Sequence, residues 1–139
     1  MNITAKLFIY IEFECSKMNQ KKIEEIWKDA DSYFSPKDSV YYEFESDKKI
    51  EKHRKNDYCN LRYEVLQKEK SLTDILVEFL QYHREQIESS FDISSDLKKR
   101  IHVCIYPEQA QYTMEFSQEL LRLILSLNLE IGTTILHLG

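Results

Sequence analysis

One segment near the N-terminus limits the possible folds more than any other part of the chain. From residue 3 to residue 14 the side chains alternate, and every odd position up to residue 13 is apolar. Successive side chains of a β-strand point to opposite faces of the sheet. The segment therefore predicts a long strand with one fully buried face and a second face that is apolar only at its middle, at Phe8 and Tyr10.

Two later segments have the spacing of amphipathic helices. Ser71 and Asp74 resemble a capping box, with Asp in place of the usual Glu, and Ser117 is placed to cap a third helix. The residues that recur at helical spacing on one face are Leu72, Ile75, Leu76, Phe79, Leu80, His83 and Ile87 in the first case, and Leu120, Leu121, Ile124, Leu125 and Leu127 in the second. A shorter helix that begins near Asn19 is predicted to carry Ile23, Ile26, Trp27 and Ala30 on one side. Further strands are predicted over 40–44, 61–65, 101–106 and 129–138.

These elements predict a single α+β domain that spans residues 1–139. We expect one mostly antiparallel sheet with helices on one face, in the β-α-β-β-α-β order of ferredoxin-like folds, extended by a C-terminal α-β pair. A chain of 139 residues suits one domain. The predicted core comprises Leu7, Ile9, Ile11, Trp27, Leu76, Phe79, Leu80, Val103, Ile105, Leu121 and Ile124.

Composition argues against several functional classes. The chain has only two glycines, Gly132 and Gly139, so no glycine-rich loop for a nucleotide phosphate can be written. The three cysteines and four histidines have no zinc-ligand spacing, and no nucleophile motif occurs. We therefore expect no catalytic residues, no cofactor and no metal. The longest apolar run, residues 7–11, is too short to cross a membrane, and the N-terminus lacks the pattern of a secretory signal, which predicts a cytoplasmic location.

Four carboxylates form a stripe along the helix predicted after Ser71. At roughly 100° per residue, the polar positions opposite its apolar side are Asp74, Glu78, Gln81, Glu85 and Glu88, with Arg84 at the flank. Helix surfaces usually alternate acidic and basic residues for mutual support. The stripe is either a merely solvated face or a surface that receives a basic partner.

The tract 46–58 (SDKKIEKHRKNDY) is basic and has no apolar period. We expect it to form an exposed loop. Its basic residues lie near Tyr41, Tyr42 and Tyr58, a combination that can stack RNA bases. Interleaved acidic residues favour a solvated loop instead, and we expect no direct nucleic-acid binding. Tyr41 and Tyr58 are the next candidates for contacts with a protein partner.

The C-terminal third resembles a known family. Segments 116–131 (FSQELLRLILSLNLEI) and 133–136 (TTIL) are similar to the closing helix and strand of a family of small bacterial α+β domains of unknown function. Proteins of this kind are often immunity proteins of polymorphic or contact-dependent toxin systems. The chain departs from the family at Tyr63, where a tryptophan is usual, at Asn128, where a glycine is usual, and around Gly132, where an acidic residue is usual.

The resemblance implies that the chain neutralises a toxin, and the net charge of -5 suits a basic partner. Our hypothesis is an immunity protein that binds a cognate bacterial toxin domain, a nuclease, through Asp74, Glu78, Glu85, Glu88, Tyr41 and Tyr58. Many nuclease domains are basic because they bind phosphate backbones. The alternatives are a non-catalytic interaction domain that can form a homodimer, and an enzyme whose site one sequence does not reveal.

Overall fold

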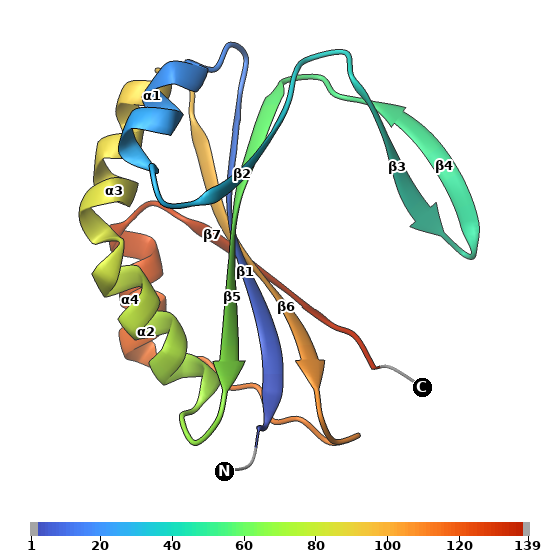
Figure 1. The fold of residues 1–139 in the computed structure, drawn as a ribbon, viewed down its shortest axis with the longest axis vertical. Coiled ribbons are helices and arrows are strands. Elements are labelled where there is room, and N and C mark those ends of the chain that lie inside the picture. The colour runs from blue at the N-terminus through green and yellow to red at the C-terminus, as the bar shows by residue number, and fades with distance from the viewer. Residues whose placement is uncertain (1–2, 138–139) are drawn as a thin grey trace.

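A five-stranded sheet, one layer of helices and a separate hairpin make up residues 3–137, the part of the chain that the computed structural model describes (Figure 1). The strands are β1 (Ala5–Cys15), β2 (Asp31–Ser35), β3 (Val40–Glu45), β4 (Lys48–His53), β5 (Asp57–Gln67), β6 (Lys98–Pro107) and β7 (Glu130–Ile135). The helices are α1 (Gln20–Ile26), α2 (Leu72–Tyr82), α3 (Arg84–Ser89) and α4 (Gln118–Ser126), with a 3-10 turn η1 (Ser90–Ile93). The predicted α+β class is confirmed.

Strand β1 lies at the centre of the sheet, whose order is β2-β5-β1-β6-β7. It pairs antiparallel with β5 and β6, β2 pairs antiparallel with β5, and β7 is parallel to β6. Consequently β1 and β2 run parallel with β5 between them, and β5 and β6 run parallel with β1 between them. Both helical connections, α1 and α2–α3, therefore pass over one intervening strand.

The helices cover one face of the sheet, as predicted (Figure 1). The odd-numbered side chains of β1 are buried against them, whereas Lys6, Phe8, Tyr10 and Glu12 remain only half-buried on the open face. Side-chain oxygens of Asn19, Ser71 and Ser117 accept the backbone N–H three residues ahead and so begin α1, α2 and α4. No helix within residues 3–137 is long and apolar enough to span a membrane.

Nine of the eleven predicted core residues are buried, and Phe79 packs on the core half-buried. Leu121 is an error, because 46% of its surface is exposed. Helix α4 buries Leu120 and Ile124, four residues apart, and Leu121 lies about 100° further round the helix.

The prediction of a single sheet was wrong in the region 31–58. The strand predicted at 40–44 does not join the main sheet; β2, which the sequence pattern missed, takes that place beside β5. Residues 40–53 form instead a separate two-stranded sheet, and the tract 46–58 is not a loop but contains β4 and the start of β5. Its turn is Ser46-Asp47, with φ of 49° and 65°. Such turns usually carry Asn-Gly, and Ser46-Asp47 is therefore not a turn signal.

Two further boundaries differ from the prediction. The helix expected from Ser71 to Glu88 is interrupted at His83, where α2 ends and α3 begins. The last strand, predicted over 129–138, spans Glu130–Ile135, and Leu138 lies outside the described residues.

Candidate partner-binding surfaces

The base of the β3–β4 hairpin is tied to the body of the protein by backbone hydrogen bonds and one carboxylate. The Arg54 N–H donates to the Ser39 carbonyl (2.9 Å), and the Asp38 N–H donates to the Arg54 carbonyl (2.8 Å). The Asp57 carboxylate accepts the N–H groups of Lys37 (2.8 Å) and Met18 (2.9 Å). These bonds fix Arg54 where the hairpin meets the open face of the sheet.

The Arg54 guanidinium lies between two tyrosine rings. Its Cζ atom is 4.1 Å from the centroid of Tyr41, on β3, and 4.0 Å from that of Tyr58, on β5. The Tyr58 hydroxyl in turn donates to the Glu12 carboxylate (2.7 Å) on β1, and burial raises the pKa of this tyrosine. The structure therefore brings the two predicted tyrosines, Tyr41 and Tyr58, into one cluster with Arg54, a residue that the sequence reasoning did not select.

Arg54 is the positive charge of this cluster, and its side-chain N–H groups lack hydrogen-bond acceptors among the described residues. Within residues 3–137 its side chain makes no hydrogen bond or ion pair, and its Nε atom is buried without a partner. Stacking on aromatic rings compensates part of the desolvation of a guanidinium, but it leaves the N–H donors unused. A buried donor of this kind costs about 1–3 kcal/mol or more when it is charged.

The two faces of the hairpin differ in character. The face that carries Tyr41 has a charge ladder, in which the Lys52 Nζ atom lies 2.6 Å from Glu43 and 3.8 Å from Glu45. The alternate residues of β3 lie on the opposite face. They are apolar and exposed: Val40 (46%), Tyr42 (50%) and Phe44 (75%). Only the Lys49 ammonium, 4.2 Å from the Tyr42 ring centroid, covers part of this row.

The four carboxylates of the predicted acidic stripe are all exposed, on two helices rather than one. Two of them have partners. The Glu78 carboxylate accepts two bonds from Lys70 (2.6 and 2.8 Å), and Glu88 accepts one from Arg84 (2.8 Å). Asp74 and Glu85 form no ion pair within residues 3–137. The stripe lies on the helical side of the molecule, and the hairpin lies on the other side, so the structure does not bring the two predicted sets of contact residues together (Figure 1).

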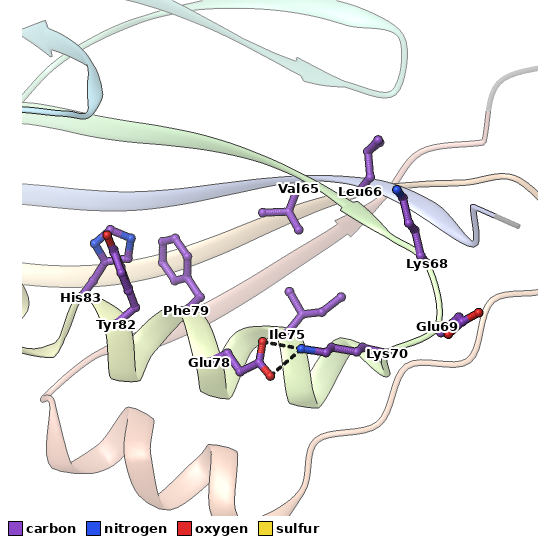
Figure 2. Close-up of a pocket in the computed structure, with 10 residues that line it drawn as sticks. All are labelled: Val65, Leu66, Lys68, Glu69, Lys70, Ile75, Glu78, Phe79, Tyr82 and His83. Carbon is purple, nitrogen blue, oxygen red and sulfur yellow. Dashed lines mark hydrogen bonds and ion pairs between the residues drawn. The ribbon is translucent and has the colours of Figure 1, made fainter. Parts of the chain in front are cut away.

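A groove of about 590 Å³ separates the end of β5 from α2 (Figure 2). Val65 points from the strand toward the helix, Ile75 and Phe79 point from the helix toward the strand, and the Lys70–Glu78 pair lies at the rim (Figure 2). Strand β2 pairs with only the first part of β5, residues 58–62, so the strand beside the groove has no neighbour on that edge. The groove can accept an apolar side chain.

Comparison of the chain with protein-family models, with curated proteins and with solved structures finds no match. Within residues 3–137 no three His, Cys, Asp or Glu side chains are grouped so that they could hold a metal ion.

His102 and Cys104 share one face of the sheet, and Cys59 lies on the other face. His102 and Cys104 are half-buried on β6 at positions opposite Tyr10 and Phe8, whereas Cys59 is buried among the core residues on the helical side of the sheet. The His102 Nε2 atom hydrogen-bonds the Thr134 hydroxyl (2.9 Å), and burial, the largest cause, lowers the pKa of the ring. Burial raises the pKa of Cys104, so its thiol is protonated at neutral pH and a poor nucleophile.

One signal in the sequence could have revealed the hairpin and, with it, Arg54. Residues 43–45 are acidic at both ends and residues 48–52 carry three lysines, so the two segments have complementary charges about Ser46-Asp47. Opposite charges on facing positions of antiparallel strands are stabilising. Glu45 does face Lys48 in the pairing of β3 with β4.

Proposed function

We propose that the chain is an immunity protein that binds and neutralises a bacterial toxin domain, a basic nuclease, in the cytoplasm of the cell that makes it. The single observation that carries the proposal is the β3–β4 hairpin, which extends from the body and exposes Val40, Tyr42 and Phe44. The likeness of the C-terminal helix and strand to small bacterial immunity domains supports the choice of partner.

The physical argument begins with the instability of an isolated hairpin. A two-stranded hairpin is marginally stable in water unless a hydrophobic face packs on something. None of the three apolar residues of the outer row belongs to the hydrophobic core or packs on it. Neighbouring exposed apolar side chains of this kind mark sites of protein association. Tyrosine and arginine, which dominate the energetics of protein interfaces, lie at the base of the same hairpin.

The acidic stripe is the second surface that we propose for the toxin. Asp74 and Glu85 form no ion pair in the part of the chain that the structure describes, and the chain as a whole is acidic. An acidic protein attracts a basic nuclease over distances of about a Debye length, ~8–10 Å at moderate salt, and so speeds their encounter. Its contribution is to the rate of association, whereas the buried hairpin contacts govern dissociation.

The proposal is tested by protection of living cells. We expect a toxin gene directly beside the gene for this chain. Bacteria that express its toxin domain should stop growing, and co-expression of the chain should restore growth. The two proteins should also purify as one complex. Continued growth arrest with the folded chain present at equal or higher level, and no complex on purification, contradicts the proposed function.

One observation favours a second function, self-association. Leu121 and Leu125 are 46% and 80% exposed and lie one turn apart on α4. A second copy of the chain would cover them in a homodimer. Sedimentation at several concentrations distinguishes a dimer from a monomer that awaits a different partner.

We also propose that strands β2, β5, β1 and β6, with α1 and α2–α3, constitute a ferredoxin-like unit. The antiparallel pairing of these four strands and the two crossovers support this assignment. On this view the hairpin is an insertion between β2 and β5, and α4 with β7 is an extension. An insertion free of the core can change its sequence to fit a partner without loss of the fold.

A further inference from the structure

We infer that Arg54 is a receptor for a carboxylate, the side chain of an aspartate or glutamate on a partner protein. The starting point is the guanidinium held between Tyr41 and Tyr58 at 4.1 and 4.0 Å, with no hydrogen-bond or ion-pair partner in residues 3–137. Because the Nε atom is buried, a ligand reaches Arg54 through the terminal NH2 groups of the guanidinium. A planar N–H edge matches the two oxygens of a carboxylate.

The surroundings of Arg54 have the charge that such a ligand needs. The residue lines a cavity of about 890 Å³, which also includes Lys37 and Lys55. Neither lysine forms an ion pair within residues 3–137. The cavity also holds three carboxylates: Glu14 accepts a bond from Asn56 (2.9 Å), Glu51 lies 3.7 Å from His53, and Asp38 forms no ion pair within residues 3–137. Arg54, Lys37 and Lys55 therefore line one cavity without ionic partners among residues 3–137.

The same cavity argues against a nucleic-acid backbone as the ligand. Glu14, Asp38 and Glu51 are distributed around its wall, and the chain carries a net charge of -5. Closely spaced phosphates would meet these carboxylates and be repelled. A single carboxylate that enters at Arg54 avoids them. The inference adds an acidic residue to the toxin surface expected to contact the hairpin, and in this respect it rests on the proposed function.

The test uses a blocked tripeptide with one glutamate between two alanines as the probe and needs no toxin, so the inference and the proposed function can fail separately. The Nε–H signal of Arg54 is followed by two-dimensional NMR at low salt while the peptide is added. We expect a saturable shift with a Kd of about 1 mM. The signal of Arg84, which is already paired with Glu88, should not move.

Two variants separate the guanidinium from simple charge. Arg54→Lys keeps the charge but loses the planar N–H edge, and we expect it to weaken the peptide about tenfold. The matched control, Lys55→Gln, removes a neighbouring charge and should weaken it no more than about threefold. If Arg54→Lys disturbs the hairpin amide signals, the shift of the Arg54 signal in the unmodified protein decides the question.

Three results would overturn the inference. They are no saturable Arg54 shift up to about 20 mM peptide, unchanged affinity in the folded Arg54→Lys variant, and tighter binding of inorganic phosphate than of the peptide. The last result would assign the site to phosphate and hence to a nucleic-acid backbone.

Discussion

Two half-buried tyrosines differ in whether the side-chain hydroxyl has a hydrogen-bond partner. The Tyr63 hydroxyl is buried without a partner in residues 3–137, in a cluster where its ring lies 5.1 Å from Phe79 and 4.7 Å from His83, centroid to centroid. The Tyr112 hydroxyl donates to the Gln67 side chain (2.6 Å). An unpaired buried hydroxyl is costly, whereas a bonded one stabilises the fold.

We therefore predict opposite effects of the same substitution. Tyr63→Phe should raise the free energy of unfolding by up to about 1 kcal/mol, and Tyr112→Phe should lower it by about 1 kcal/mol. Urea unfolding at neutral pH measures both. A loss of stability in Tyr63→Phe would show that its hydroxyl has a partner.

A second prediction concerns alkaline pH. Burial raises the pKa of the Cys59 thiol from 9.0 to about 12, and it raises those of Tyr58 and Tyr63 as well. Since the folded-state pKa lies above the unfolded one, the folded protein holds its proton more tightly. The stability this contributes is complete below about pH 9 and is lost as pH rises toward 12. The unfolding free energy should fall steadily above about pH 9, less steeply in Cys59→Ala. A flat profile up to about pH 11 would contradict this origin.

At the scale of elements, the β3–β4 hairpin does not pair with the main sheet, and we expect it to unfold without the core. Ser46 and Asp47 both adopt the left-handed conformation, which costs non-glycine residues about 1 kcal/mol each. Replacing them by Asn-Gly should slow hydrogen exchange of the β4 amides about fivefold or more. Exchange in β1 should not change, because no core residue is altered. Equal slowing in β1 would mean that the hairpin and the core unfold together.

The sequence predicts well those elements in which the spacing of apolar residues matches the buried face of the strand or helix. The alternation of residues 3–14 identified β1 because each odd side chain faces the helices. The pattern missed β2, whose five residues are mostly exposed and polar at an edge. It also missed β4, where lysines face glutamates across the hairpin and no apolar period exists. Short edge strands and exposed hairpins are stabilised by pairing with a neighbouring strand, and this pairing leaves no apolar pattern in the sequence.

At the scale of the whole molecule, the helical side and the hairpin side are distinct surfaces. The sequence brought Tyr41 and Tyr58 forward for their aromatic rings, and the structure places both on Arg54. Arg54 joins them only through the closing of the hairpin, whose one signal in the sequence is the complementary charge of residues 43–45 and 48–52. The partner of Glu78 was hidden, because Lys70 lies before the helix, whereas Arg84 stands four residues before Glu88 on α3, the spacing of a helical ion pair.

Charge reversal on the helical side should affect the rate of encounter with the toxin. We expect Asp74→Lys with Glu85→Lys to slow association several-fold at low salt and little at high salt, with the dissociation rate nearly unchanged. Stopped-flow or surface binding at two salt concentrations measures this, and circular dichroism checks folding. An unchanged association rate at low salt would remove these two residues from the interaction.

The central claim is that the exposed row of the hairpin binds the toxin. Its most direct test is the equilibrium affinity of the purified toxin domain for the double variant Tyr42→Ser with Phe44→Ser. Tyr82→Ser is the matched control, because Tyr82 is an equally large aromatic residue, 80% exposed on the helical side. We predict a loss of about a hundredfold or more for the hairpin variant and less than about threefold for the control. Unchanged affinity of the folded hairpin variant would contradict the claim.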